Sequence, residues 1–245
     1  FTAQGPEHCA FISGSDGNQL TVEFNRVLVA VGRRANTSGF GLEELGVATN
    51  DNGTVAVDQF LRTSCPTIFA AGDVAGPYQL THAAGHQAWF AGVNALFGQF
   101  KKFAVDYRVM PQVIFIDPQF ARVGLNELEA SEQGIEVEVT VYDLSDLDRA
   151  IADGDANGMV KVLTAAGTDR ILGAAIIGPQ AGELITEYVT AMKYNFGLNK
   201  ILATIHSYPT LSEANKYVAG EWKRKHVPEW LLHWVAKYYR WKLGR

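Results

Sequence analysis

The chain has 245 residues, of which 47% are hydrophobic and 19% are charged, and its formal net charge is −5. This balance fits a globular α/β or α+β protein with room for one large or two smaller domains, and it excludes a disordered or fibrous chain. No apolar run reaches the length that a membrane-spanning helix needs. Because the sequence starts at Phe1 with strand-like residues, we expect it to be the C-terminal part of a longer protein.

The two cysteines, Cys9 and Cys65, are far apart in the sequence and form no Cys-x-x-Cys pair. With no metal-ligand spacing present, the sequence predicts no metal site, and both thiols are expected to be buried as small apolar residues. Low cysteine use favours a reducing compartment, so we expect a cytoplasmic protein.

The first elements in chain order are the strands of a hairpin within residues 10–31. Asp16-Gly17 supplies a turn that tolerates positive φ, and the return strand alternates from Leu20 to Phe24. It then becomes wholly apolar from Val27 to Val31. This change predicts a strand that passes into a sheet covered on both faces.

The most informative stretch is a short apolar strand, predicted from Thr67 to Ala71, that ends in Gly72-Asp73 and is followed by a predicted helix from Thr81 to Phe97. A glycine lets a ligand approach the backbone closely, and the Asp73 carboxylate can accept hydrogen bonds from polyol hydroxyls. The N-terminus of the helix favours an electron-rich ring or an anion. For Ala-Gly-Asp alone, an ordinary strand-turn-helix with a turn aspartate is the simpler alternative.

Glycine and charge interrupt the pattern near residues 98–108, which indicates a domain boundary. Strands are predicted beyond it over residues 111–118, 121–125, 136–142, 158–163 and 171–177. Asn126 and Glu129 form a capping box for a short helix, and a longer helix is predicted from Ala181 to Phe196 with Gly197 as its C-cap. Strands and helices grouped in this way predict an α+β domain with an antiparallel sheet.

The C-terminal tail has a different character. Residues 221–245 carry a net charge of +5 and the remaining residues −10. Residues 229–243 are compatible with one helix, in which His233, Lys237 and Arg240 form a narrow polar stripe. Basic residues with Trp and Tyr fit an interfacial membrane helix or a helix that docks on a partner protein. Packing of the tail on its own dimer is the alternative that the sequence favours, and no nucleic-acid partner is expected.

The segments VGRRANT, GLEELGV, LRTS and IFAAGDV, in this order and spacing, resemble the pyridine nucleotide-disulfide oxidoreductases, although Ala35 stands where the family usually has proline. VIFIDPQFARVGLNE and ILGAAIIGPQAGELI extend the resemblance. It implies an α/β plus α+β fold with four parts: the end of an NAD(P)-binding domain (1–34), the C-terminal part of an FAD-binding domain (35–105), a dimerisation domain (106–220) and the basic aromatic tail (221–245).

The resemblance also implies cofactors and site residues. Asp73 would bind the ribitol of FAD, and the cofactor-binding set would comprise Gly72, Asp73, Gln79, Leu80, Thr81 and His82. The full-length protein would be a homodimeric enzyme that passes hydride from NAD(P)H through the flavin to a disulfide or another small-molecule acceptor, and this chain alone would be inactive. The alternative is a catalytically incomplete dimerisation module whose tail binds a membrane or a partner.

Near the end of the predicted dimerisation domain, the family carries a His-Pro pair whose histidine is the acid/base, oriented by a glutamate five residues later. Here Tyr208 precedes Pro209, while Glu213 keeps its place, so Tyr208 and Glu213 are the predicted catalytic residues. A phenol with an ordinary pKa near ~10 is a poor base at neutral pH, so disulfide reduction by a His–Glu base is not expected.

Mercuric reductase is similar in having a tyrosine five residues before a glutamate, but its terminal cysteine pair has no counterpart after Cys65. An interface packing role for Tyr208 stands beside the catalytic one. His206 is expected to be structural.

Overall fold

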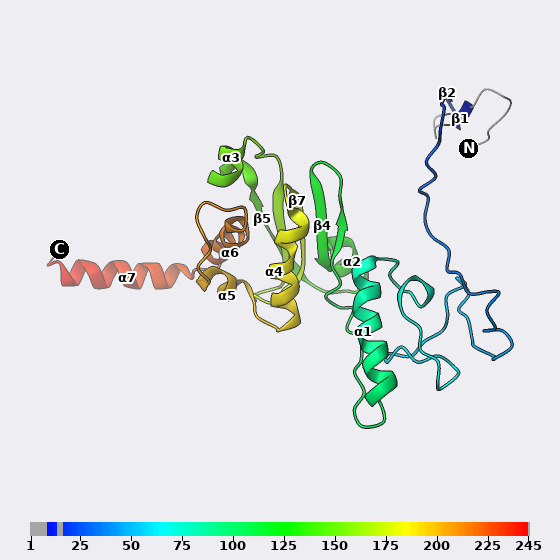
Figure 1. Cartoon of the computed structure of the whole chain (residues 1–245). Helices are drawn as coiled ribbons and strands as arrows, with labels where there is room; N and C mark the ends of the chain where they lie inside the picture. The colour runs from blue at the N-terminus through cyan, green and yellow to red at the C-terminus, as the bar shows by residue number, and fades with distance from the viewer. Residues whose placement is uncertain (1–8, 14–16, 245) are drawn as a thin grey trace. The chain divides into compact units, whose positions relative to one another are not determined.

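The computed structural model describes residues 9–13 and 17–244. The chain divides into two compact units, residues 1–105 and residues 106–245, and each is described by itself (Figure 1). The predicted turn residue Asp16 lies outside the described residues.

Unit 1 begins with a two-stranded hairpin, as predicted. Strands β1 (Cys9–Ser13) and β2 (Gln19–Glu23) pair antiparallel, with Cys9 opposite Glu23. The strand predicted from Val27 to Val31 is wrong: this segment has no strand pairing, and Leu28 is 90% exposed. The prediction failed because an apolar run becomes a buried strand only when neighbouring strands take up its backbone hydrogen bonds.

The segment predicted as a strand at 67–71 forms only the isolated bridge Arg62–Phe69, and a second isolated bridge joins Thr49 to Val55. Within the described residues of unit 1, the sheet expected of an FAD-binding domain is therefore not formed. The expected helix is present as α1 (Thr81–Phe97), preceded by a 3₁₀ turn, η1 (Gly72–Val74). Cys65, expected to be buried, is partly exposed.

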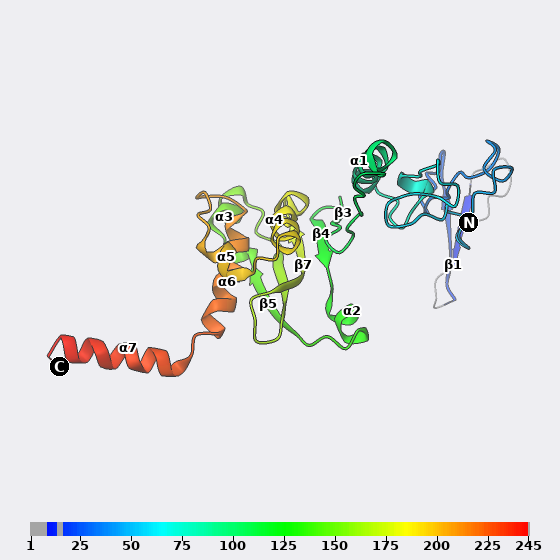
Figure 2. The ribbon, with the colours of Figure 1, turned by 90° about the horizontal axis from the view of Figure 1, so that it is seen from below.

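Unit 2 contains a fully antiparallel five-stranded sheet of order β3-β4-β7-β6-β5 (Figures 1 and 2). Its strands are β3 (Gln112–Ile114), β4 (Gln119–Gly124), β5 (Val137–Asp143), β6 (Met159–Ala165) and β7 (Ile171–Gly178). The predicted antiparallel α+β domain is thus confirmed. Its register places Ala121, Ile176 and Val160 side by side, and one two-residue step along each strand brings Val123, Ala174 and Val162 onto the same buried face.

Helices bury this face. Unit 2 contains η2 (Leu144–Asp146), α2 (Glu127–Glu132), α3 (Asp148–Asp153), α4 (Ala181–Lys193), α5 (Leu198–Ala203), α6 (Glu213–Lys225) and α7 (Glu229–Lys242). The helix α4 packs against β4 and β7, and α6 packs against β5 and β6, as the view from below shows (Figure 2). Side chains of α4, α5, α6 and the sheet share one core cluster.

Local capping sets the helix ends. Asn126 and Glu129 form the predicted capping box at α2. The helix α4 ends at Lys193, earlier than predicted, and Gly197 is the N-cap of α5 instead of the C-cap of α4. Asn195, with φ +57°, supplies the left-handed residue after α4. A β-carbon on Gly197 would collide with Asp169, so this glycine is required for close packing.

Among residues 9–13 and 17–244, no helix combines the length and apolar character needed to cross a membrane.

Two isoleucines of unit 2 provide a test of this core. Ile185 of α4 is 1% exposed within the cluster, so Ile185→Ala removes buried methyl groups and should lower the free energy of unfolding by about 2–5 kcal/mol. Ile151 of α3 is 56% exposed, and Ile151→Ala should change it by less than about 0.5 kcal/mol. Urea unfolding of both variants measures the difference. If both variants changed the free energy of unfolding equally, Ile185 would not belong to the core.

Candidate functional site

The predicted Gly72-Asp73 site lies in η1, which packs against the first turns of α1. Gly72 has φ +82°, and a β-carbon on it would lie 3.3 Å from the β-carbon of Ala84. Both the backbone conformation and the narrow space therefore favour glycine at this position. The turn closes through the Ala75 amide, which donates to the Gly72 carbonyl at 2.9 Å.

A buried glutamine of α1 fixes the position of this turn. The Gly72 amide donates to Gln87 Oε1 at 2.6 Å, and Gln87 Nε2 donates to the Gly76 carbonyl at 2.7 Å. The Gln87 side chain is fully buried. A single side chain thus satisfies one backbone donor and one backbone acceptor on opposite sides of Asp73.

The Asp73 carboxylate remains accessible beside this rigid turn. Its side chain is 34% exposed, and its Oδ2 lies 3.1 Å from Nη1 of Arg33, whose side chain is 70% exposed. An ion pair this exposed contributes little, so a ligand hydroxyl can replace the guanidinium at low cost. Asp73 is therefore a hydrogen-bond acceptor held at a defined place.

The other predicted cofactor-binding residues surround the start of α1. Gln79 and Leu80 are half-buried, and Thr81 and His82 are exposed on the first turn. Leu80, the N-cap residue, has no side chain that can accept from the helix amides, and the first turn carries no acidic residue. This end of the 17-residue helix suits an electron-rich ligand atom.

The predicted catalytic pair, Tyr208 and Glu213, is not hydrogen-bonded to each other. Tyr208 is 68% exposed and donates its hydroxyl to Asp148 Oδ2 at 3.0 Å. Glu213 is buried; it accepts from the Thr210 amide at 3.2 Å and from the Tyr217 hydroxyl at 3.3 Å. Glu213 therefore binds its own loop and Tyr217, whereas the phenol of Tyr208 binds Asp148.

The phenols of this cluster have raised pKa values. The hydrogen bond to Asp148 and the negative charge of that carboxylate raise the pKa of Tyr208. Burial, with Asp146 as a further contributor, raises the pKa of Tyr142 to about 12. The rings of Tyr142 and Tyr217 lie 5.4 Å apart. At neutral pH this cluster therefore contains neutral phenols and no phenolate base.

Sequence reasoning missed Asp148 and Gln87. Asp148 lies 60 residues before Tyr208, so no local spacing relates them. Gln87 did leave a signal, because the buried residues of α1 are Ala83, Gln87, Ala91 and Asn94 on one helical face. Two amides on an otherwise small and apolar face indicate side chains that bind backbone groups.

His206 has a packing role in the structure. Its side chain is 6% exposed, with Nε2 3.0 Å from Glu187 Oε1 and Nδ1 3.1 Å from the Thr204 carbonyl oxygen. Both ring nitrogens therefore have protein partners. In the part of the chain that the structure describes, no group of three or more His, Cys, Asp or Glu side chains could hold a metal ion.

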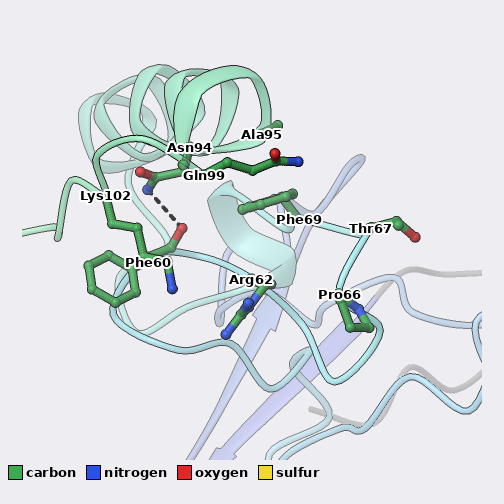
Figure 3. Close-up of a pocket in the computed structure, with 10 residues that line it drawn as sticks. Phe60, Arg62, Pro66, Thr67, Phe69, Asn94, Ala95, Gln99 and Lys102 are labelled. Carbon is green, nitrogen blue, oxygen red and sulfur yellow. Dashed lines mark hydrogen bonds between the residues drawn. The ribbon is translucent and has the colours of Figure 1, made fainter.

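A separate cavity of about 310 Å³ lies in unit 1 between the C-terminal half of α1 and residues 60–69 (Figure 3). Its lining includes no predicted site residue. Both of its cations have partners, since Arg62 pairs with Asp58 at 3.4 Å and the Lys102 ammonium lies 5.3 Å from the ring centre of Phe60. Asn94 donates to the Phe60 carbonyl at 3.0 Å across one side of the cavity (Figure 3).

Comparison with known proteins identifies the family. A model described as pyridine nucleotide-disulphide oxidoreductase matches residues 3–88, and one described as the dimerisation domain of the same family matches residues 110–219. The chain belongs to the pyridine nucleotide-disulphide oxidoreductase family.

Curated relatives include dihydrolipoyl dehydrogenases. That of Chlamydia muridarum is 40% identical over 191 residues, covering 78% of this chain and 40% of the relative. That of Thermus scotoductus is 39% identical over 206 residues, covering 84% of this chain and 44% of the relative. The chain thus spans less than half the length of these relatives.

Solved structures show the same likeness. LpdA from Mycobacterium tuberculosis matches 90% of this chain and 47% of its own, with 27% identity and a TM-score of 0.79. RclA from Escherichia coli, an HOCl-induced flavoprotein disulfide reductase, matches 82% of this chain and 46% of its own, with 27% identity and a TM-score of 0.73.

Replacing Gln87 tests whether it holds the Asp73 turn. In Gln87→Leu, the Gly72 amide and the Gly76 carbonyl lose their partner, at a cost of about 1–3 kcal/mol for each group. Hydrogen exchange of a peptide covering residues 70–78 should therefore become faster. In the matched control Asn94→Leu, exchange should rise near Phe103, which Asn94 binds in both directions, and stay unchanged at 70–78. If residues 70–78 exchange as slowly in Gln87→Leu as in the parent chain, the turn does not need the Gln87 hydrogen bonds.

Replacing Asp148 tests the control of the Tyr208 pKa. Asp148 accepts a hydrogen bond from the neutral phenol and its charge opposes the phenolate, so both effects raise the pKa. Asp148→Ala should therefore shift the Tyr208 titration to lower pH, towards the ordinary value near ~10. Ring-labelled tyrosine NMR across an alkaline pH series measures this shift. Glu132→Ala, which removes an exposed carboxylate of α2, should leave it unchanged; an unshifted titration in Asp148→Ala would contradict the assignment.

Proposed function

We propose that this chain is the C-terminal portion of an FAD-dependent NAD(P)H oxidoreductase that reduces a disulfide or another small-molecule acceptor. The observation that carries the proposal is the Gly72-Asp73 turn, held by Gln87 against the start of α1. The relatives named dihydrolipoyl dehydrogenase support it, and so does the flavoprotein disulfide reductase among the structural neighbours.

The residues of unit 1 fit the FAD that the family uses. The Asp73 carboxylate is partly exposed on a turn that Gln87 binds on both sides, which suits the hydroxyls of a polyol chain, and the narrow space at Gly72 keeps side chains away from that position. Gln79, Leu80, Thr81 and His82 would complete this side of the site at the N-terminus of α1. When bound, the flavin supplies hydride acceptance from the nicotinamide and electron transfer to the acceptor.

On the acceptor side, we assign Tyr208 and Glu213 complementary roles. Tyr208 presents a protonated hydroxyl at an exposed position, oriented by Asp148. Glu213 orders the loop that carries the tyrosine by accepting from the Thr210 amide. A hydrogen bond from Tyr208 to an acceptor would replace the one that it donates to Asp148. The neutral phenol does not suit removal of a proton from a thiol.

The whole protein is proposed to act as a homodimer. The match to the family's dimerisation domain supports this, and it covers the five-stranded sheet of unit 2. An exposed apolar run at Ile114, Phe115 and Ile116, which are 53%, 80% and 59% exposed, continues the β3 edge of that sheet. Pairing of two copies would remove this apolar surface from water.

The flavin assignment is tested in two forms of the protein. Purified alone, the 245-residue chain should neither retain stoichiometric FAD nor oxidise NADH, because it holds one side of the proposed site. Stoichiometric flavin together with turnover in this chain would refute the proposal that it is an incomplete portion.

In the full-length protein, Asp73→Asn should lower FAD affinity about tenfold or more, the effect of losing a charge-assisted hydrogen bond worth about 1.5–3 kcal/mol. Flavin absorbance after dialysis measures this loss. Asp51→Asn, which alters an exposed turn carboxylate of the same unit, should retain the flavin. Equal retention in Asp73→Asn would remove Asp73 from the cofactor site.

A further inference from the structure

The C-terminal helix α7 has an apolar surface without a partner in the described chain. Every side chain from Glu229 to Lys242 is exposed. Its tryptophans Trp230, Trp234 and Trp241 are 68%, 69% and 77% exposed, and three of the five tryptophans of the whole chain lie in this one helix. A solvent-exposed aromatic cluster of this kind marks an interaction surface.

The side chains are sorted around the helix axis. At about 100° per residue, Glu229, His233, Lys237 and Arg240 occupy roughly a quarter of the circumference. The three tryptophans lie along one border of this polar stripe. The remaining arc is mostly apolar or aromatic and comprises Leu231, Leu232, Val235, Ala236, Tyr238 and Tyr239, with Lys242 near the helix end.

The shape of this surface favours a lipid occupant over a protein groove. A helix that docks in a groove presents one narrow stripe of anchors, whereas α7 is apolar around most of its circumference. Tryptophans at the border between the polar and apolar faces are typical of helices that lie at a membrane surface. A helix of 14 residues is about 21 Å long, too short to cross an apolar layer of about 30 Å.

The charge of the tail selects the kind of lipid. Residues 221–245 have a net charge of +5, and the remainder of the chain −10. Lys223 and Lys225 are exposed at the end of α6, and Lys237, Arg240 and Lys242 lie on α7. An anionic surface attracts each such cation near it with an energy of about RT or more. The same surface repels the acidic remainder of the chain. The tail is therefore complementary to an anionic membrane.

The base of the tail is fixed to unit 2. His226 Nε2 lies 2.8 Å from Glu138 Oε2 on β5, and the His226 ring stacks on Trp222 with centres 4.1 Å apart. Only Val227 and Pro228 separate this anchor from the first residue of α7. Any surface that α7 binds is thereby joined to the sheet domain through a short link.

We propose that α7 is an interfacial helix that binds the surface of an anionic phospholipid membrane. Its apolar arc enters the border of the acyl region, the tryptophans lie at the headgroup level, and Lys237 and Arg240 contact the lipid phosphates. In a homodimer, two such helices would act together and strengthen attachment by avidity. The proposal is independent of flavin chemistry.

Vesicle co-sedimentation of the whole chain tests this inference. We expect binding to vesicles that contain equal parts of phosphatidylglycerol and phosphatidylcholine, with a blue shift of tryptophan fluorescence, and little binding to phosphatidylcholine alone. Deleting residues 229–245 should abolish binding. Replacing Trp230, Trp234 and Trp241 together by alanine, or Lys237, Arg240 and Lys242 together by glutamate, should each weaken it about tenfold or more.

Trp89→Ala is the matched control, because Trp89 of α1 is also an exposed tryptophan, 59% accessible, and lies outside the tail; it should bind vesicles as the parent chain does. Binding that survives the deletion, or that is equal on both kinds of vesicle, would overturn the proposal. So would loss of dimer mass on deletion without any vesicle binding, since that result assigns α7 to a second copy of the chain. None of these outcomes depends on FAD content.

Discussion

Two buried amide side chains on one face of α1 bind backbone groups of the segments packed around this helix in unit 1. Gln87 holds the turn that carries Asp73, and Asn94 binds the backbone at Phe60 and Phe103. In the described residues of this unit, strand pairing is limited to one hairpin and two isolated bridges. Turns and bridges satisfy many backbone groups of this unit, and the two amides of α1 satisfy further ones at Gly72, Gly76, Phe60 and Phe103. The turn that carries Asp73 therefore depends both on Gly72 and on the hydrogen bonds from Gln87.

Unit 2 is organised differently. An antiparallel sheet satisfies the backbone hydrogen bonds of its strands, and the strand register places the apolar side chains together on one face. Alternation places Val160, Val162 and their cross-strand neighbours under α4 and α6. The rigid core then fixes the exposed loop with Tyr208 and the anchored end of α6 at His226. Proposed chemistry and proposed membrane attachment thus both lie in unit 2, one at the contact of Asp148 in α3 with Tyr208 and the other at the contact of Glu138 in β5 with His226.

The departure from the family at Tyr208 has a physical consequence beyond the change of one side chain. A histidine held by a glutamate can exchange a proton near neutral pH, whereas a phenol bonded to a carboxylate stays protonated. Glu213 keeps its place in the sequence but contacts Tyr217 and the Thr210 amide. Both positions of the family motif are therefore occupied, but in this structure Glu213 does not bind the side chain that precedes Pro209.

The sequence by itself determined the elements whose signals are local: the hairpin β1–β2, the helix α1, the capping box at Asn126 and the alternating strands of unit 2. The order and spacing of segments such as IFAAGDV were also sufficient to indicate the family. Sequence reasoning failed at Val27–Val31, because an apolar run does not show whether neighbouring strands are present. It also failed at Gly197, because the position of the helix end depended on Asn195 and on packing against Asp169. Only the tertiary structure decided the partners of Asp73, Tyr208 and Glu213. The partners of Asp73 and Tyr208 lie 40 and 60 residues away, and hydrogen bonds between such distant residues leave no periodic pattern in a sequence. The partners of Glu213 are only three and four residues away, but the fold of the loop selects them.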